Sequence, residues 1–207
     1  MLFISHCHNI AQRLKSRFGQ GYQIEMKVDE PTKVDEDLKQ IVGILLELKG
    51  EGPISDPENG AGRDDIFFNL EQTLLAAQKV AGDNYISDKI TEHDSAGYLI
   101  FKSASSEVGV ELEELAAFCA IDLRLKDLTE FFADMYPTSV VRETQDTRMR
   151  FEVPSAGVQV SSLFSSIEEN KKRLNLQDYG ISQTTLEQVF NMHAAAAEAK
   201  KQGTDDG

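Results

Sequence analysis

The chain has 207 residues, of which 21 are Lys or Arg and 35 are Asp or Glu, so its formal net charge is −14. This acidic excess argues against binding to nucleic acid or to anionic membrane surfaces, because both need clustered cations. Hydrophobic residues make up 41% of the sequence, which is enough for a chain of this length to bury a folded core.

The sequence lacks the marks of a membrane-spanning or exported chain. Its apolar runs are far shorter than the roughly 20 residues needed to cross a bilayer. The first residues contain neither a basic region nor a long apolar region, so we expect no signal peptide. Cys7 and Cys119 are too few for a disulfide framework, and we expect both to be free thiols in a reducing compartment.

The chain begins with a predicted helix and a predicted strand. Ile10, Leu14 and Phe18 are spaced four residues apart, which predicts a short amphipathic helix within residues 1–20. Apolar and polar residues then alternate from Tyr22 to Val28, the pattern of a half-buried strand.

Residues 29–109 have a different character, with many acidic residues and turn formers. Apolar spacings predict two helices, around 38–48 and 67–77. Residues 50–65 contain four glycines and two prolines, which predicts a mobile loop. Residues 82–109 are polar and rich in turn formers. We therefore expect a largely helical segment here.

Beyond residue 110 the periodicity switches between helix and strand. Apolar residues at three- and four-residue spacings predict one long helix from Val110 to the break at Pro137. A hairpin, a helix, an edge strand and a last helix with a capping-box pair follow. Their predicted positions are 140–143 and 148–153 for the hairpin strands, 145–147 for the turn, 160–174 for the helix, 176–181 for the edge strand and 184–190 for the last helix.

The order strand, helix, strand, strand, helix, strand predicts an α+β fold, an α/β sandwich with a ferredoxin-like split βαβ core. The core comprises 21–28 and 110–190, the helical insertion follows the first strand at 29–109, and 191–207 forms a fraying helical tail. Loop-closure cost grows only slowly with loop length, so deleting residues 34–109 is expected to leave a cooperative fold.

Catalytic and metal-binding motifs are scarce. The sequence has no P-loop, and its glycine pairs at 50–52 and 60–62 lie among acidic residues that would repel a phosphate. The His6-Cys7-His8 cluster has ligand chemistry but no second ligand group at a recognisable spacing, so we expect no metal site. Glu111, Glu113 and Glu114 lie at a predicted helix start, where the helix dipole favours negative charge. We expect no enzyme activity from this chain.

Two basic groups stand out in the acidic chain. Arg148 and Arg150 lie on one face of a predicted strand, and residues 171–173 carry two lysines and an arginine at a helix end. Cations at a helix C-terminus can simply complement its dipole. The functional alternative is a docking surface for an acidic partner.

Two segments resemble a known family. Residues 13–22, RLKSRFGQGY, resemble the L-K-x-R-F-G-x-G-Y stretch that leads out of the nucleotide-binding domain in ATP-binding cassette (ABC) transporters of subfamily A. Residues 174–190 contain YGISQTTLEQVF, which is similar to the closing motif Y-x-x-S-Q-T-T-L-D/E-Q-V-F of that family. Both segments occur in the family's order, on either side of a hairpin and of a helix ending in N-K-K-x-L, and together the matches cover about 100 residues.

The resemblance implies a cytosolic regulatory domain that follows a nucleotide-binding domain in a lipid exporter. Residues 1–20 would then be the joint to a nucleotide-binding domain that this chain lacks. That domain would hold ATP and Mg²⁺, so no cofactor is expected in the chain itself. The implied partners are the nucleotide-binding domain and a second regulatory domain, on the cytoplasmic side of a membrane. His193 and the long insertion depart from the family pattern.

The residues that the resemblance marks as contacts lie at both ends of the domain. For Val189 and Phe190 the alternative is plain core packing, in which case Phe190→Ala would cost about 3–5 kcal/mol. A different hypothesis for the whole chain is a free-standing binding module that uses its sheet face or insertion, and the weakest is an enzyme. The predicted interface residues are Arg17, Phe18, Gly19, Tyr22, Tyr179, Ser182, Gln183, Thr184, Thr185, Leu186, Gln188, Val189 and Phe190.

Overall fold

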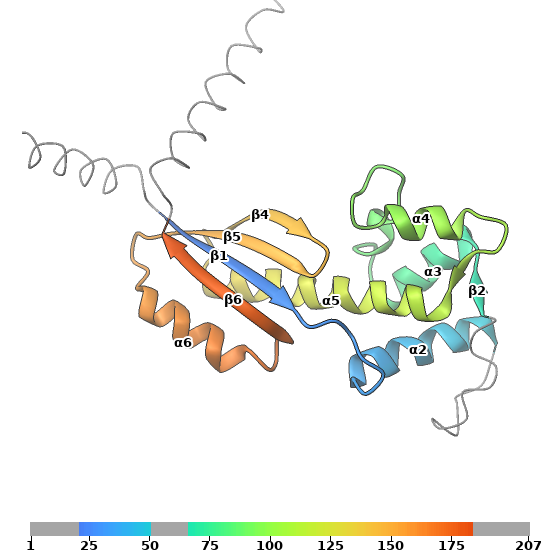
Figure 1. Ribbon diagram of the computed structural model, residues 1–207, viewed down its shortest axis with the longest axis horizontal. Helices are drawn as coiled ribbons and strands as arrows, with labels where there is room; N and C mark the ends of the chain where they lie inside the picture. Colours follow the sequence, from blue (N-terminus) through green and yellow to red (C-terminus); the bar gives the residue numbers. More distant parts are fainter. Residues whose placement is uncertain (1–20, 51–65, 184–207) are drawn as a thin grey trace, which may run out of the picture.

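The computed structural model describes residues 21–50 and 66–183 (Figure 1). The predictions for 1–20, 51–65, 184–190 and 191–207 lie outside the described residues. The elements are β1 (Gly21–Val28), α2 (Glu36–Lys49), β2 (Phe67–Phe68), α3 (Leu70–Ala81), the 3-10 turn η1 (Ser87–Lys89), α4 (Tyr98–Ala104), β3 (Val110–Glu111), α5 (Leu112–Met135), β4 (Val140–Gln145), β5 (Arg148–Pro154), α6 (Val160–Asn170) and β6 (Leu176–Gln183). This mixture of helix and antiparallel sheet confirms the predicted α+β class.

Four strands form one antiparallel sheet in the order β4-β5-β1-β6. β1 lies inside the sheet because its neighbours come from the far end of the chain, with Ile24 opposite both Phe151 and Ile181. The alternate residues of β1 and β5 pack with α5 and α6 into one buried cluster. Both helices therefore cover the same face of the sheet (Figure 1).

Helix α5 belongs to two hydrophobic cores. Its first half, including Leu112 and Leu115, packs with α2, α3 and α4. Its second half, including Leu125 and Phe132, packs under the sheet. We call the first group the helical lobe (residues 36–50 and 66–120) and the second the sheet lobe (β1 and residues 121–183). A helix of this length spans about 36 Å, so one rigid rod joins the two lobes.

The start of the long helix differs from the prediction. Val110 and Glu111 pair with Phe68 and Phe67 as a short antiparallel ribbon, and helix α5 begins only at Leu112. Gly109 makes the ribbon possible, because its φ of +95° is in the left-handed region and an added Cβ would lie 2.7 Å from the Phe68 carbonyl oxygen. The predicted turn-rich stretch before it also contains α4 and η1.

A buried arginine ties the start of the insertion to the middle of α5. Arg124 is 3% exposed, and its Nε and Nη2 donate to Asp37 at 2.8 and 3.0 Å. Nη2 also donates to Asp35 at 2.8 Å, and Nη1 donates to the carbonyl oxygen of Asp29 at 2.7 Å. Because Arg124 lies where the two cores of α5 meet, we call these contacts the Arg124 clamp. The clamp holds the segment between β1 and α2 against the middle of α5.

The clamp predicts a specific acid sensitivity. Hydrogen bonds from Arg124, and then from Thr32, lower the pKa of Asp35 to about 2. The carboxylate therefore stabilises the fold above its unfolded pKa of about 4 and loses that contribution as the pH falls through about 2. Urea midpoints of the wild type and Asp35→Asn should differ by a constant amount at neutral pH and converge between about pH 4 and pH 2. A difference that persists unchanged to pH 2 would contradict this linkage.

Candidate interaction surface on the open face of the sheet

The sheet has a second face that the described helices leave uncovered. Ile24, Met26 and Val28 point into the core, so the alternate residues of β1 point to the opposite side. Direct partners on antiparallel strands share a face, and the register therefore extends this side across all four strands. The open face comprises Gln23, Glu25, Lys27, Val140, Glu143, Gln145, Arg148, Arg150, Glu152, Asp178, Gly180 and Ser182, together with Arg142, which bonds to Glu152.

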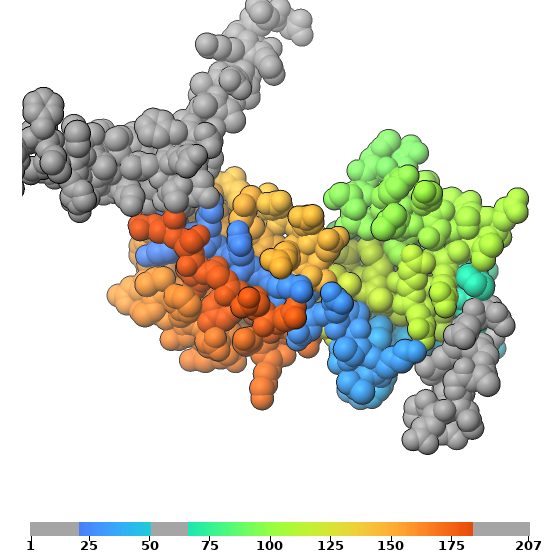
Figure 2. Space-filling model, viewed as in Figure 1, coloured from blue at the N-terminus to red at the C-terminus, as the bar shows by residue number. Residues whose placement is uncertain are grey.

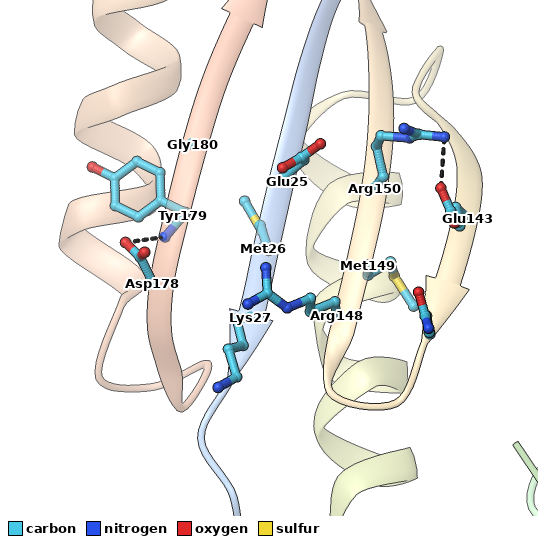
Figure 3. A pocket seen from close by; sticks show the side chains of 11 residues that line it. Glu25, Met26, Lys27, Glu143, Arg148, Met149, Arg150, Asp178, Tyr179 and Gly180 are labelled. Atoms are coloured by element: carbon cyan, nitrogen blue, oxygen red, sulfur yellow. Dashed lines mark hydrogen bonds and ion pairs between the residues drawn. The ribbon is translucent and has the colours of Figure 1, made fainter.

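Charges of both signs alternate across the open face. Arg150 Nη2 lies 2.6 Å from a Glu143 carboxylate oxygen, and Arg142 Nε lies 2.7 Å from one of Glu152. Figure 3 shows the first of these pairs bridging β5 and β4. Such partly exposed pairs stabilise a fold by only about 0–1 kcal/mol. Their main effect is to give the face a fixed pattern of charge.

The middle of the open face is hollowed. An open cavity of about 380 Å³ lies over β1, with Glu25, Arg148 and Arg150 among its lining residues (Figure 3). Arg150 Nε is buried there without a hydrogen-bond partner among the described residues. Seven of the eleven lining residues are polar or charged, and the others include Met26, Met149 and Tyr179. The mainly polar lining suits the side chains of another protein better than an apolar ligand.

The structure describes four of the predicted interface residues, and these four do not share one face of the sheet. Of the four that lie within the described residues, Ser182 is on the open face. Tyr22 and Tyr179 lie against the helix-side core, and Gln183 is opposite Tyr22 in the register. The remaining predicted residues lie outside the described part of the chain: Arg17, Phe18, Gly19, Thr184, Thr185, Leu186, Gln188, Val189 and Phe190.

Tyr179 ties the edge strand β6 to helix α6. Its hydroxyl donates to Glu168 at 2.6 Å, and its ring lies 5.9 Å from that of Phe164. Burial is the main cause that raises the pKa of Tyr179 to about 12, and the hydrogen bond to Glu168 adds to it. The hydroxyl is therefore a neutral donor at physiological pH, and its contacts describe an internal brace.

The basic groups predicted from the sequence separate in space. Arg148 and Arg150 do share one face, as predicted. Arg173 instead lies over the Phe131 ring at 5.6 Å, and Lys171 lies 6.0 Å from the Tyr179 ring, both against the helix layer. The sequence reasoning missed Glu25 and Lys27 as members of the open face. The signal was present, because both alternate with the buried residues of β1.

Within residues 21–50 and 66–183, no three His, Cys, Asp or Glu side chains are grouped so that they could hold a metal ion. No helix in the same ranges is both long and apolar enough to cross a membrane. The His6-Cys7-His8 cluster lies outside these ranges. The open face is thus the feature of the described chain that best fits a functional surface.

Residues 117–183 match the protein family described as "ABCA1-like, C-terminal R1 regulatory domain". Human ATP-binding cassette sub-family A member 2 is 32% identical over 66 residues, which is 32% of this chain and 3% of that protein. Dictyostelium discoideum ABC transporter A family member 5 is 31% identical over 124 residues, 56% of this chain and 8% of that protein. The mouse retinal-specific phospholipid-transporting ATPase ABCA4 is 35% identical over 66 residues, 32% of this chain and 3% of that protein.

Proposed function

Because residues 117–183 belong to the ABCA1-like C-terminal R1 regulatory domain family, we propose that this chain is the non-catalytic regulatory domain of a subfamily-A ABC transporter. In this proposal it lies on the cytoplasmic side of the membrane. It contacts the nucleotide-binding domains and the second regulatory domain while ATP hydrolysis in the former drives lipid transport. ATP and Mg²⁺ are bound by the nucleotide-binding domains. A relative named as a phospholipid-transporting ATPase supports a lipid as cargo.

The observation that carries the proposal is where the family match falls. It runs from residue 117, in the first half of α5, to the end of β6, so it covers the elements that, together with β1, build the sheet lobe. The chain spans only 2–8% of the relatives it matches, as expected for one domain of a much larger protein. Contact with other domains of such a protein is therefore the natural role for the charged open face.

We also propose that the sheet lobe has the ferredoxin-like plan. The strand order β4-β5-β1-β6 corresponds to second, third, first and fourth strand of that plan when the helical lobe is treated as an insertion. The two helices on one face support the same assignment. This plan hosts many unrelated functions, so the role of the chain rests on the family match and on the open face.

Charge reversal on the open face tests the proposal. Glu25→Lys should weaken binding of the chain to the nucleotide-binding domain of the same transporter by about tenfold or more, because like-charge contacts across an interface are costly. The control is Glu36→Lys, the same substitution at an exposed position of α2. Calorimetric titration measures both. Loss of binding in both variants, or in neither, would show that the open face is not the contact.

The alternative function is a free-standing module that binds a ligand or protein, and the hollow on the open face favours it. A chain that binds no nucleotide-binding domain but retains another ligand at this hollow would support the alternative. An assay of the purified chain with ATP separates both hypotheses from an enzyme. We expect no turnover above buffer, and sustained hydrolysis that follows the chain through purification would overturn the non-catalytic role.

A further inference from the structure

Lys27 and Arg148 differ from the other cations of the open face. They are direct partners in the β1–β5 register. Arg142 and Arg150 each pair with a glutamate of the sheet, whereas Lys27 and Arg148 have no side-chain ion pair within residues 21–50 and 66–183. Two like charges directly opposite each other on neighbouring strands destabilise the pairing. Asp178 is opposite Lys27 in the β1–β6 register. Neither cation is nevertheless in a side-chain ion pair within the described ranges, so both retain the capacity to bind an added carboxylate.

The same pair borders two hollows. Both residues line the cavity over the middle of the sheet and a second cavity of about 630 Å³ beside the β4–β5 turn. In Figure 2 the orange hairpin, the blue end of β1 and the yellow-green surface of α5 meet at this second hollow. We call it the interlobe groove. The Val28 amide donates to the Thr147 carbonyl oxygen at 2.9 Å, so the backbone beside the cations is fixed.

The interlobe groove combines apolar and charged walls. Its apolar part consists of half-buried Ala117 and Ile121 of α5 and of Pro31. Glu30 and Asp146 are also among its lining residues, and Asp178 of β6 lies directly opposite Lys27 on the side away from Arg148. These carboxylates would repel a polyanion such as nucleic acid or an anionic membrane. A single carboxylate meets less of this repulsion than a polyanion does, and it can lie between two cations that are not already in ion pairs, beside an apolar side chain.

We propose that Lys27 and Arg148 bind one acidic side chain of a partner protein, with an adjacent apolar side chain of that segment resting on Ala117 and Ile121. This inference rests on the proposed function, since it names the chemistry of the partner segment that the regulatory domain would meet. A guanidinium binds a carboxylate through two parallel hydrogen bonds, and Lys27 adds a point charge. The acid would also relieve the repulsion between the two cations.

Selection from a library of random short peptides tests the proposal. The full chain should enrich peptides that carry an aspartate or glutamate next to an aliphatic residue. A representative peptide should bind Lys27→Gln/Arg148→Gln about tenfold or more weakly than the wild type. The control is Arg142→Gln, an open-face cation outside the groove, which should bind normally. Replacing the peptide's acid by its amide should cost the wild type the same factor and cost the double variant nothing further.

The competing outcomes are distinct. Enrichment of basic or purely apolar peptides, or equal binding by the double variant, overturns the inference, as does displacement of the peptide by equimolar inorganic phosphate. The double variant should unfold at the same temperature as the wild type or higher, because it loses a repulsion. If it unfolds earlier, the two single variants replace it in the same assay. If the chain binds the nucleotide-binding domain but no acidic peptide in the predicted way, only the inference is refuted. If it binds the peptide as predicted but not the nucleotide-binding domain, only the proposed function is refuted.

Discussion

The double variant Asp35→Asn/Asp37→Asn is expected to lose about 3–5 kcal/mol of unfolding free energy, because it leaves the buried Arg124 charge without a carboxylate. Asparagine keeps the shape of the two side chains, so the loss reports on charge rather than on packing. Arg124→Met, which removes the buried charge itself, should cost less than the double variant even though it deletes the same ion pairs. Urea denaturation of the three chains at neutral pH measures the order.

The double aspartate variant is expected to lose more stability than Arg124→Met because the arginine is buried and the aspartates are not. Arg124 is 3% exposed, whereas the side chains of Asp35 and Asp37 are 29% and 38% exposed and can be solvated on their own. Glu36→Gln is the matched control, since Glu36 lies between the two aspartates and pairs with Lys39 at the surface. It should cost no more than about 1 kcal/mol. If Arg124→Met proved the most damaging of the set, packing of the arginine stem would outweigh its charge.

The clamp illustrates what periodicity in the sequence cannot predict. The alternation in β1 and β5 and the apolar spacing of α2, α3 and α5 are local, and the structure forms these elements close to where they were predicted. Two helix starts were wrong, because Phe67–Phe68 and Val110–Glu111 pair as the ribbon β2–β3, and α3 and α5 begin only at Leu70 and Leu112. The pairing of Arg124 with carboxylates 87 and 89 residues earlier has no local signal. From the sequence alone, Arg124 is one more charged residue in an amphipathic helix. Arg124 is buried because the segment between β1 and α2 packs against the middle of α5.

The open face was predictable only in part, for a related reason. Arg148 and Arg150 were recognised because they alternate with apolar residues within one strand. The charge pattern that they complete depends on the register with β1 and β4, and a register is a tertiary property. The four predicted contacts that the structure describes fall on both sides of the sheet, because neighbouring residues of a strand point to opposite faces.

The contacts between the two lobes also change what we expect from deleting the insertion, which the sequence alone predicted to leave a cooperative fold. Deleting residues 34–109 takes away Asp35 and Asp37, and so leaves the Arg124 charge uncompensated. It also uncovers the first half of α5, where burial of each leucine is worth about 1.5–3 kcal/mol. The residues that lose their cover are Leu112, Leu115, Ala116, Cys119 and Ala120. We therefore expect this deletion to self-associate and to unfold without a sharp transition.

A redesigned deletion should behave differently, because the two defects have separate remedies. Removing residues 34–120 together with Arg124→Gln eliminates both the exposed apolar half-helix and the unpaired charge, while the sheet-side residues such as Leu125 and Phe132 keep their contacts. This chain should be monomeric in gel filtration and should melt in one cooperative transition by circular dichroism. If the chain lacking residues 34–109 were monomeric and equally cooperative, the sheet lobe would fold without the helical lobe packed on α5. If the redesigned chain failed as well, the sheet lobe would need the first half of the helix for folding.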